Sequence, residues 1–242
     1  MNKVIVIVGA TASGKTGLAV RLAKRWNGEV ISADSRAIYR GMDIGTAKPS
    51  AEEHGGVRHF GLDLVAPDER FTAADFQEYA KKKIEEIRAR DKQPFVVGGT
   101  GLYVDALVYD YQFNNVVKNT CSDREVMNTD FIMVGIKWER DELRARIEQR
   151  ANTIFEQPIT EETKRLVGKY GWGSQAMKSN IYPIVWRMMQ GEITEEEARR
   201  LFVLDDWHLA KRQLTWFKRN PHIHWFSLSE IEHFVNNLFE KL

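Results

Sequence analysis

The chain has 242 residues, 43% of them hydrophobic, which suits one α/β domain with a sizeable core. Lys and Arg total 35 against 34 Asp and Glu, so the molecule is no polycation, and a nucleic acid would need local basic patches. The single Cys121 excludes an internal disulfide, and no apolar run is long enough to span a membrane, so we expect a cytoplasmic protein without a signal peptide.

The first predicted elements are a strand, a glycine-rich loop and a helix. Residues 4–8 are aliphatic, and residues 9–16 (GATASGKT) match the pattern G-x-x-x-x-G-K-[ST] ahead of a helical repeat. In this pattern the loop amides and the helix N-terminus attract a phosphate, Lys15 adds a charge, and the Thr16 hydroxyl can bind Mg²⁺. The loop therefore predicts a diphosphate or triphosphate ligand held by Gly9, Ala10, Thr11, Ala12, Ser13, Gly14, Lys15 and Thr16.

A second buried strand, residues 29–32, leads into Asp34. Because α/β sheets bind ligands outside the carboxyl ends of their strands, Asp34 is well placed for chemistry, with a helix cap or a metal ligand as the alternatives. The irregular residues 37–49 then predict a loop near the site. In that loop Thr46 and Lys48 are candidates for reaching a substrate, the alternative being an ordinary surface loop.

The remaining pattern alternates strands and helices. Residues 57–64 fit an edge strand or a loop, and Thr72 is expected to cap a helix over residues 73–90. The buried strand 94–97 enters a second glycine-rich turn (GGTGLY), where Thr100 would start the next helix with its hydroxyl facing the cleft. Further elements are expected at residues 131–136, 139–151, 205–219, 222–226 and 230–242. The pattern indicates an α/β fold whose mostly parallel sheet is flanked by helices, as in P-loop NTPases.

Three motifs together resemble the tRNA dimethylallyltransferases, also called tRNA isopentenyltransferases. The motifs are GATASGKT, then SADSRAIYRGMDIGTAKP at residues 32–49, then GGTGLY; the match is dense over residues 1–107 and resumes at 143–154 and 209–218. That family transfers a dimethylallyl group from dimethylallyl diphosphate to N6 of the adenosine 3′ of the tRNA anticodon. The resemblance implies dimethylallyl diphosphate and the tRNA anticodon stem-loop as partners and Mg²⁺ as cofactor, and we expect a monomer.

The resemblance also implies roles for single residues. The loop of residues 9–16 would hold the diphosphate of the prenyl donor, with Lys15, Arg212 and Mg²⁺ neutralising it as it departs. Asp34 would be the general base that takes the proton from the N6 amine. Contacts with the flipped-out base and its RNA are implied for Asp34, Ser35, Arg36, Ala37 and Thr100.

Other parts of the chain depart from the family pattern. Residues 110–130 form a short polar bridge where the family has a helical insertion, so residues 139–204 predict a helical part with a reduced RNA-binding subdomain inside one domain of residues 1–242. Residues 171–184 differ from the corresponding family segment, although Tyr182 remains. A Thr-Arg pair of the family appears here as Asp206 and Trp207, which removes one phosphate-facing arginine.

Some assignments stay open at this stage. Met42 and Tyr103 either line a slot for the prenyl group or belong to the core, and the four arginines of helix 139–151 are interpreted as a solvated face, namely Arg140, Arg144, Arg146 and Arg150. Three alternative functions also remain: prenyl transfer to a free adenine nucleotide, phosphoryl transfer by a P-loop enzyme, and RNA binding without catalysis.

Overall fold

The computed structural model describes residues 3–113, 127–178 and 181–240; Cys121 and most of the predicted polar bridge lie outside these residues. The elements in chain order are β1 (Val4–Val8), α1 (Lys15–Arg25), β2 (Gly28–Ser32), α2 (Ala51–His54), β3 (His59–Phe60), α3 (Ala73–Arg88), β4 (Gln93–Gly98), α4 (Gly101–Val108), β5 (Phe131–Ile136), α5 (Arg140–Phe155), α6 (Ile159–Tyr170), α7 (Tyr182–Met189), α8 (Glu195–Lys218), β6 (Ile223–Phe226) and α9 (Leu228–Glu240).

The described strands form one sheet in the order β3-β2-β4-β1-β5-β6, and every neighbouring pair is parallel. The central strand β1 is fully buried, which explains why residues 4–8 are aliphatic without alternation. The α/β fold with a parallel sheet is therefore confirmed. The weak pattern at residues 57–64 is the two-residue edge strand β3, and β6 forms the opposite edge.

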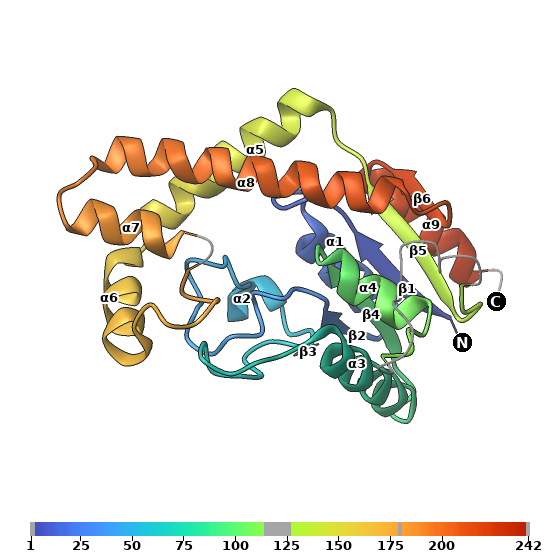
Figure 1. The fold of residues 1–242 in the computed structure, drawn as a ribbon. Helices are drawn as coiled ribbons and strands as arrows, with labels where there is room; N and C mark the ends of the chain where they lie inside the picture. Colours follow the sequence, from blue (N-terminus) through green and yellow to red (C-terminus); the bar gives the residue numbers. More distant parts are fainter. Residues whose placement is uncertain (1–2, 114–126, 179–180, 241–242) are drawn as a thin grey trace.

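Helices cover both faces of the sheet (Figure 1). On one face, α1 and α9 pack against β1, β2, β4 and β5 through a cluster that includes Leu18, Phe95 and Val235. On the other face, α3, α4 and the end of α8 pack through a cluster that includes Phe76, Val104 and Phe217. Within the described residues, no helix combines the length and the apolar character that crossing a membrane requires.

A separate helical part stands beside the sheet. It consists of α5, α6, α7 and the first half of α8, which pack around a core of their own that includes Leu166, Tyr182 and Phe202. The helix predicted from residue 205 begins ten residues earlier, because Thr194 and Glu197 form a capping box at the start of α8. At 24 residues α8 is about 36 Å long, and it runs from the helical part to the sheet (Figure 1).

The helical core gives a stability prediction. Phe202 is 1% exposed and its ring lies edge-on to Phe155 at 6.4 Å, so Phe202→Ala should leave a cavity and lower the free energy of unfolding by about 3–5 kcal/mol. Urea denaturation measures the loss. The matched control is Leu204→Ala on the same helix, where the side chain is 48% exposed and the change should stay within about 0.5 kcal/mol. Equal losses in the two variants would contradict the packing described.

Candidate active site

A cavity of about 1310 Å³ lies at the carboxyl ends of β1, β2 and β4. The first glycine-rich loop follows β1, the segment around Asp34 follows β2, and the second glycine-rich turn follows β4. Because these strands are neighbours in a parallel sheet, their three following loops converge. Residues 11–16, 34–37 and 98–100 line the cavity, together with Arg212 from α8, whereas Gly9 and Ala10 are buried.

The first glycine-rich loop has the geometry that its sequence predicts. Gly14 adopts φ +84°, a left-handed conformation that favours glycine, and α1 begins at the next residue. Lys15 extends its Nζ to the carbonyl oxygen of Ala10 at 2.5 Å. Burial lowers the pKa of Lys15 to about 8, although the carboxylates of Asp34 and Asp206 act in the opposite direction. Lys15 is thus a cation that the protein alone solvates poorly and that an anion would stabilise.

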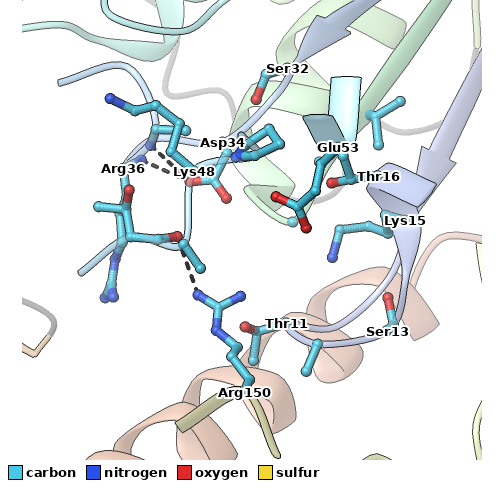
Figure 2. A pocket seen from close by; sticks show the side chains of 18 of the residues that line it. Thr11, Ser13, Lys15, Thr16, Ser32, Asp34, Arg36, Lys48, Glu53 and Arg150 are labelled. Atoms are coloured by element: carbon cyan, nitrogen blue, oxygen red, sulfur yellow. Dashed lines mark hydrogen bonds between the residues drawn. The ribbon is translucent and has the colours of Figure 1, made fainter. Parts of the chain in front are cut away.

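Asp34 lies opposite Lys15 across the cavity (Figure 2). Its Oδ1 accepts hydrogen bonds from the backbone amides of Arg36 at 2.8 Å and of Ala37 at 3.4 Å, which orients the carboxylate. The Asp34 carboxylate therefore caps its own turn while it faces the cavity. Asp34 therefore lines the cavity as expected, but the helix-cap alternative is wrong, because residues 35–38 form a turn and not a helix.

Thr100 joins the second glycine-rich turn to the Asp34 segment. It stands at the N-cap of α4, but its hydroxyl does not cap that helix. Instead Oγ1 accepts a hydrogen bond from the Ser35 amide at 2.9 Å and donates one to the Ser35 hydroxyl at 3.1 Å. The relative position of the loops after β2 and β4 is thereby fixed, with Ser35 and Thr100 side by side at the cavity wall.

Helix α8 closes the cavity with polar side chains that sequence reasoning left unassigned. The Gln213 side chain accepts a hydrogen bond from the Thr11 amide at 2.7 Å and donates one to the Gly99 carbonyl at 3.1 Å, so one amide group joins both glycine-rich loops. About two turns earlier on the helix, Asp206 accepts a hydrogen bond from the Thr11 hydroxyl at 3.4 Å. The same carboxylate lies 3.3 Å from the Arg150 guanidinium.

The interpretation of the α5 arginines as a solvated face is wrong for two of the four. Arg146 donates to the Ala12 carbonyl at 2.7 Å and lies over the Trp138 ring, and Arg150 donates to the Thr46 carbonyl at 3.2 Å. Both line the cavity, whereas Arg140 and Arg144 are exposed. The spacing i, i+4 of Arg146 and Arg150 beside the inward-facing Ile147 was a signal that one basic face packs against the loops.

The loop of residues 41–49 is held by a buried carboxylate from the helical part. Glu162, which is 5% exposed, accepts hydrogen bonds from the backbone amides of Asp43, Ile44 and Gly45 at 2.9–3.0 Å. It also accepts a hydrogen bond from the Tyr182 hydroxyl at 2.8 Å, and burial together with this carboxylate raises the pKa of Tyr182. A side chain at Gly45 would collide with the Tyr182 ring, so the glycine is required by this close approach.

Four candidate residues of the sequence analysis are held by contacts within the protein. Thr46 and Lys48 line the cavity. The Thr46 hydroxyl, however, donates to the Met42 carbonyl, and Lys48 forms salt bridges with Asp43 and Asp63. Met42 is part of the helical core, and Tyr103 stacks on Phe76 at 4.5 Å. The core alternative therefore holds for Met42 and Tyr103, and neither lines the cavity.

Comparison with known proteins gives one consistent family. The sequence model described as IPP transferase matches residues 37–127 and 113–220. The tRNA dimethylallyltransferase of Acetivibrio thermocellus is 34% identical over 96% of this chain and 94% of its own, and that of Alkaliphilus oremlandii is 35% identical over 96% and 93%. The solved structure of the Bacillus halodurans tRNA isopentenylpyrophosphate transferase has a TM-score of 0.86 at 33% identity, covering 100% of this chain and 98% of that one.

The alignment with the Acetivibrio thermocellus protein also shows a difference in length within the chain. It runs over 293 positions, more than the 242 residues of this chain, so the chain lacks internal segments that the relative contains.

The buried carboxylate gives a testable prediction. Glu162→Gln replaces an acceptor-only group with an amide, so at least one of the surrounding N–H or O–H donors loses its partner. We expect a loss of about 1–3 kcal/mol in the free energy of unfolding, measured by urea denaturation. Glu161→Gln is the matched control, because Glu161 is exposed and should change stability by less than about 0.5 kcal/mol. A loss as small as that of the control would contradict the anchoring role.

The lowered pKa of Lys15 gives a second prediction. Below about pH 8 the free protein already carries the Lys15 charge, whereas above it binding of a phosphate must take up a proton. The advantage of wild type over Lys15→Met in binding inorganic pyrophosphate should be greatest below pH 8 and fall above it, by up to about tenfold per pH unit. Isothermal titration at pH 7 to 9.5 measures this ratio, and Lys24→Met, at an exposed position of α1, should follow wild type throughout. A ratio independent of pH would contradict the assignment.

Proposed function

Because the chain belongs to the IPP transferase family, we propose that it transfers a dimethylallyl group from dimethylallyl diphosphate to N6 of the adenosine 3′ of the anticodon in tRNA. The observation that carries this proposal is the cavity itself, in which the carboxylate of Asp34 faces Lys15 and the glycine-rich loop (Figure 2). A general base and a site for a diphosphate leaving group thus stand on opposite sides of one space. Such a space suits in-line displacement between an amine and an allylic diphosphate.

The first glycine-rich loop would bind the diphosphate. The amides at the start of α1 have no partner within the helix, so they are available to donate to an anion. The diphosphate would stabilise the charged form of Lys15, because a nearby anion raises the pKa that burial has lowered. Arg212 and Arg146, which line the same cavity, add positive charge where the leaving group develops negative charge.

Asp34 would act on the nucleophile. The lone pair of the adenine N6 amine is conjugated into the ring, so loss of its proton as the C–N bond forms makes it competent. The amides of Arg36 and Ala37 hold the Asp34 carboxylate in one orientation for this step. We place the flipped-out base against Ser35 and Thr100, whose mutual hydrogen bonds fix the wall beside Asp34.

A magnesium ion fits the oxygen donors of this cavity. The described residues contain no group of three acidic, His or Cys side chains that could enclose a metal by themselves. Mg²⁺ is typically held by one or two protein oxygens together with substrate phosphates, and the Thr16 hydroxyl would supply such an oxygen at the cavity wall. Bound there, Mg²⁺ would neutralise part of the diphosphate charge. Since one chain supplies these groups, we also propose that the protein works as a monomer, in the cytoplasm where its tRNA is found.

One observation favours a second acceptor. The chain lacks internal segments that its tRNA-modifying relative contains, which leaves a free adenine nucleotide as the alternative substrate of the same chemistry. Competition between AMP and an anticodon stem-loop for labelled dimethylallyl diphosphate separates the two. Product on the stem-loop supports tRNA, and product on AMP alone supports the nucleotide.

The direct test is incubation of the folded protein with unmodified tRNA, Mg²⁺ and dimethylallyl diphosphate, followed by nucleoside analysis. We expect N6-dimethylallyl adenosine from the position 3′ of the anticodon. Absence of any prenylated nucleoside, with the protein shown to be folded by circular dichroism, would contradict the proposal.

Asp34→Ala should separate chemistry from binding. Loss of a general base should lower turnover by about 10²- to 10⁴-fold, while dimethylallyl diphosphate still binds on the intact glycine-rich loop. Single-turnover kinetics and isothermal titration measure the two effects. Asp68→Ala is the matched control, because Asp68 is exposed and lies outside the cavity, and it should retain wild-type rates. Turnover near wild type in Asp34→Ala would remove Asp34 from the mechanism.

A further inference from the structure

We propose that Asp206 and Gln213 of α8 set the number of phosphates that the first glycine-rich loop accepts, so that it takes a diphosphate and rejects a triphosphate. This inference rests on the proposed function in that it explains the choice of a diphosphate ligand. It concerns two side chains that sequence analysis did not include among the ligand-binding residues.

Both hydrogen-bond donors of Thr11 are already engaged. Its backbone amide donates to Gln213 Oε1 at 2.7 Å, and its hydroxyl donates to Asp206 Oδ2 at 3.4 Å. Thr11 and Asp206 are almost fully buried, so neither donor is turned toward bulk solvent. This end of the loop therefore presents oxygen atoms of α8, not free N–H groups, to anything in the cavity.

The Gln213 side chain cannot flip its amide group to release the Thr11 amide. Its Nε2 donates to the Gly99 carbonyl at 3.1 Å, which accepts only. Exchanging the oxygen and nitrogen of the amide would place two donors face to face at Thr11 and two acceptors face to face at Gly99. The oxygen of Gln213 is thereby locked against Thr11.

Thr11 lies at the end of the loop where the outermost phosphate of a triphosphate would bind. In loops of this pattern the lysine reaches the outer phosphates of a triphosphate, while the helix start and loop amides hold the inner ones. Here the Lys15 Nζ lies against the Ala10 carbonyl, directly beside Thr11. The outermost phosphate of a triphosphate would thus arrive where the Thr11 donors are engaged, whereas two phosphates still fit between Lys15 and the free amides at the start of α1.

The charge of Asp206 also acts against a third phosphate. The Asp206 carboxylate is 2% exposed, and its charge acts on Lys15, whose pKa it raises against the effect of burial. A phosphate oxygen beside this carboxylate would be repelled at low effective dielectric. Arg150, which lines the same cavity, lies 3.3 Å from Asp206 and donates to the Thr46 carbonyl; it holds the carboxylate in place, and the carboxylate in turn pairs its charge. A third phosphate therefore meets Thr11 donors that are already engaged and an Arg150 cation whose charge Asp206 already pairs.

The test compares two inorganic probes, pyrophosphate and tripolyphosphate, by isothermal titration at one Mg²⁺ concentration and one pH. No prenyl transfer is needed. Wild type should bind pyrophosphate at least about tenfold more tightly than tripolyphosphate, and Asp206→Asn should reduce this preference by about tenfold or more. Asp205→Asn is the matched control, since Asp205 is the adjacent, exposed residue of α8 and should keep the wild-type preference.

Each outcome decides the inference. A preference that falls in Asp206→Asn and persists in Asp205→Asn supports it. A wild-type protein without the preference, or an Asp206→Asn variant that changes both affinities equally, overturns it. If Asp206→Asn does not fold, Asp206→Ser gives the same comparison, because it also removes the carboxylate charge beside Thr11. Failure of the tRNA assay together with the expected binding preference would reject the proposed reaction and leave this inference standing.

Discussion

The convergence of three loops at one edge of a parallel sheet is the constraint on which the site depends. β2, β4 and β1 are neighbours, so the segments that follow them must meet, and each segment carries one part of the chemistry. Convergence alone does not fix their distances. The Ser35–Thr100 contact joins the first two loops, and the Gln213 amide joins the second to the glycine-rich loop. Because Gln213 belongs to α8, the geometry of the cavity also depends on that helix, which is not adjacent in sequence to any of the three loops.

The helical part extends this dependence to the far side of the cavity. Glu162 holds three consecutive backbone amides of an irregular loop, and Arg150 reaches from α5 to the carbonyl of Thr46 in the same loop. Irregular backbone next to a cavity needs partners for its polar groups, and here charged side chains supply them. The helices α5 to α8 therefore act on the reaction by shaping the loops, even though the chain lacks segments present in longer relatives.

The sequence predicted the elements whose signals are local. The aliphatic run of β1, the pattern of residues 9–16 and the GGTGLY turn each determine their structure within a few residues. The sequence alone therefore placed Lys15, Asp34 and Thr100 at the carboxyl ends of the strands. Glu162, Asp206 and Gln213 could not, because each binds the backbone or side chain of a residue more than one hundred positions away. The start of α8 is a different case, since the Thr194–Glu197 capping box was present in the sequence and marked it.

The central claim is that one cavity holds the amine nucleophile at Asp34 and the diphosphate at the glycine-rich loop at the same time. The most direct measurement is a crystal structure with an anticodon stem-loop and a non-reactive analogue of dimethylallyl diphosphate. The account predicts adenine N6 within about 2.6–3.2 Å of an Asp34 oxygen, with the diphosphate on Lys15 and the start of α1. A base bound elsewhere, or a diphosphate away from the glycine-rich loop, would contradict it.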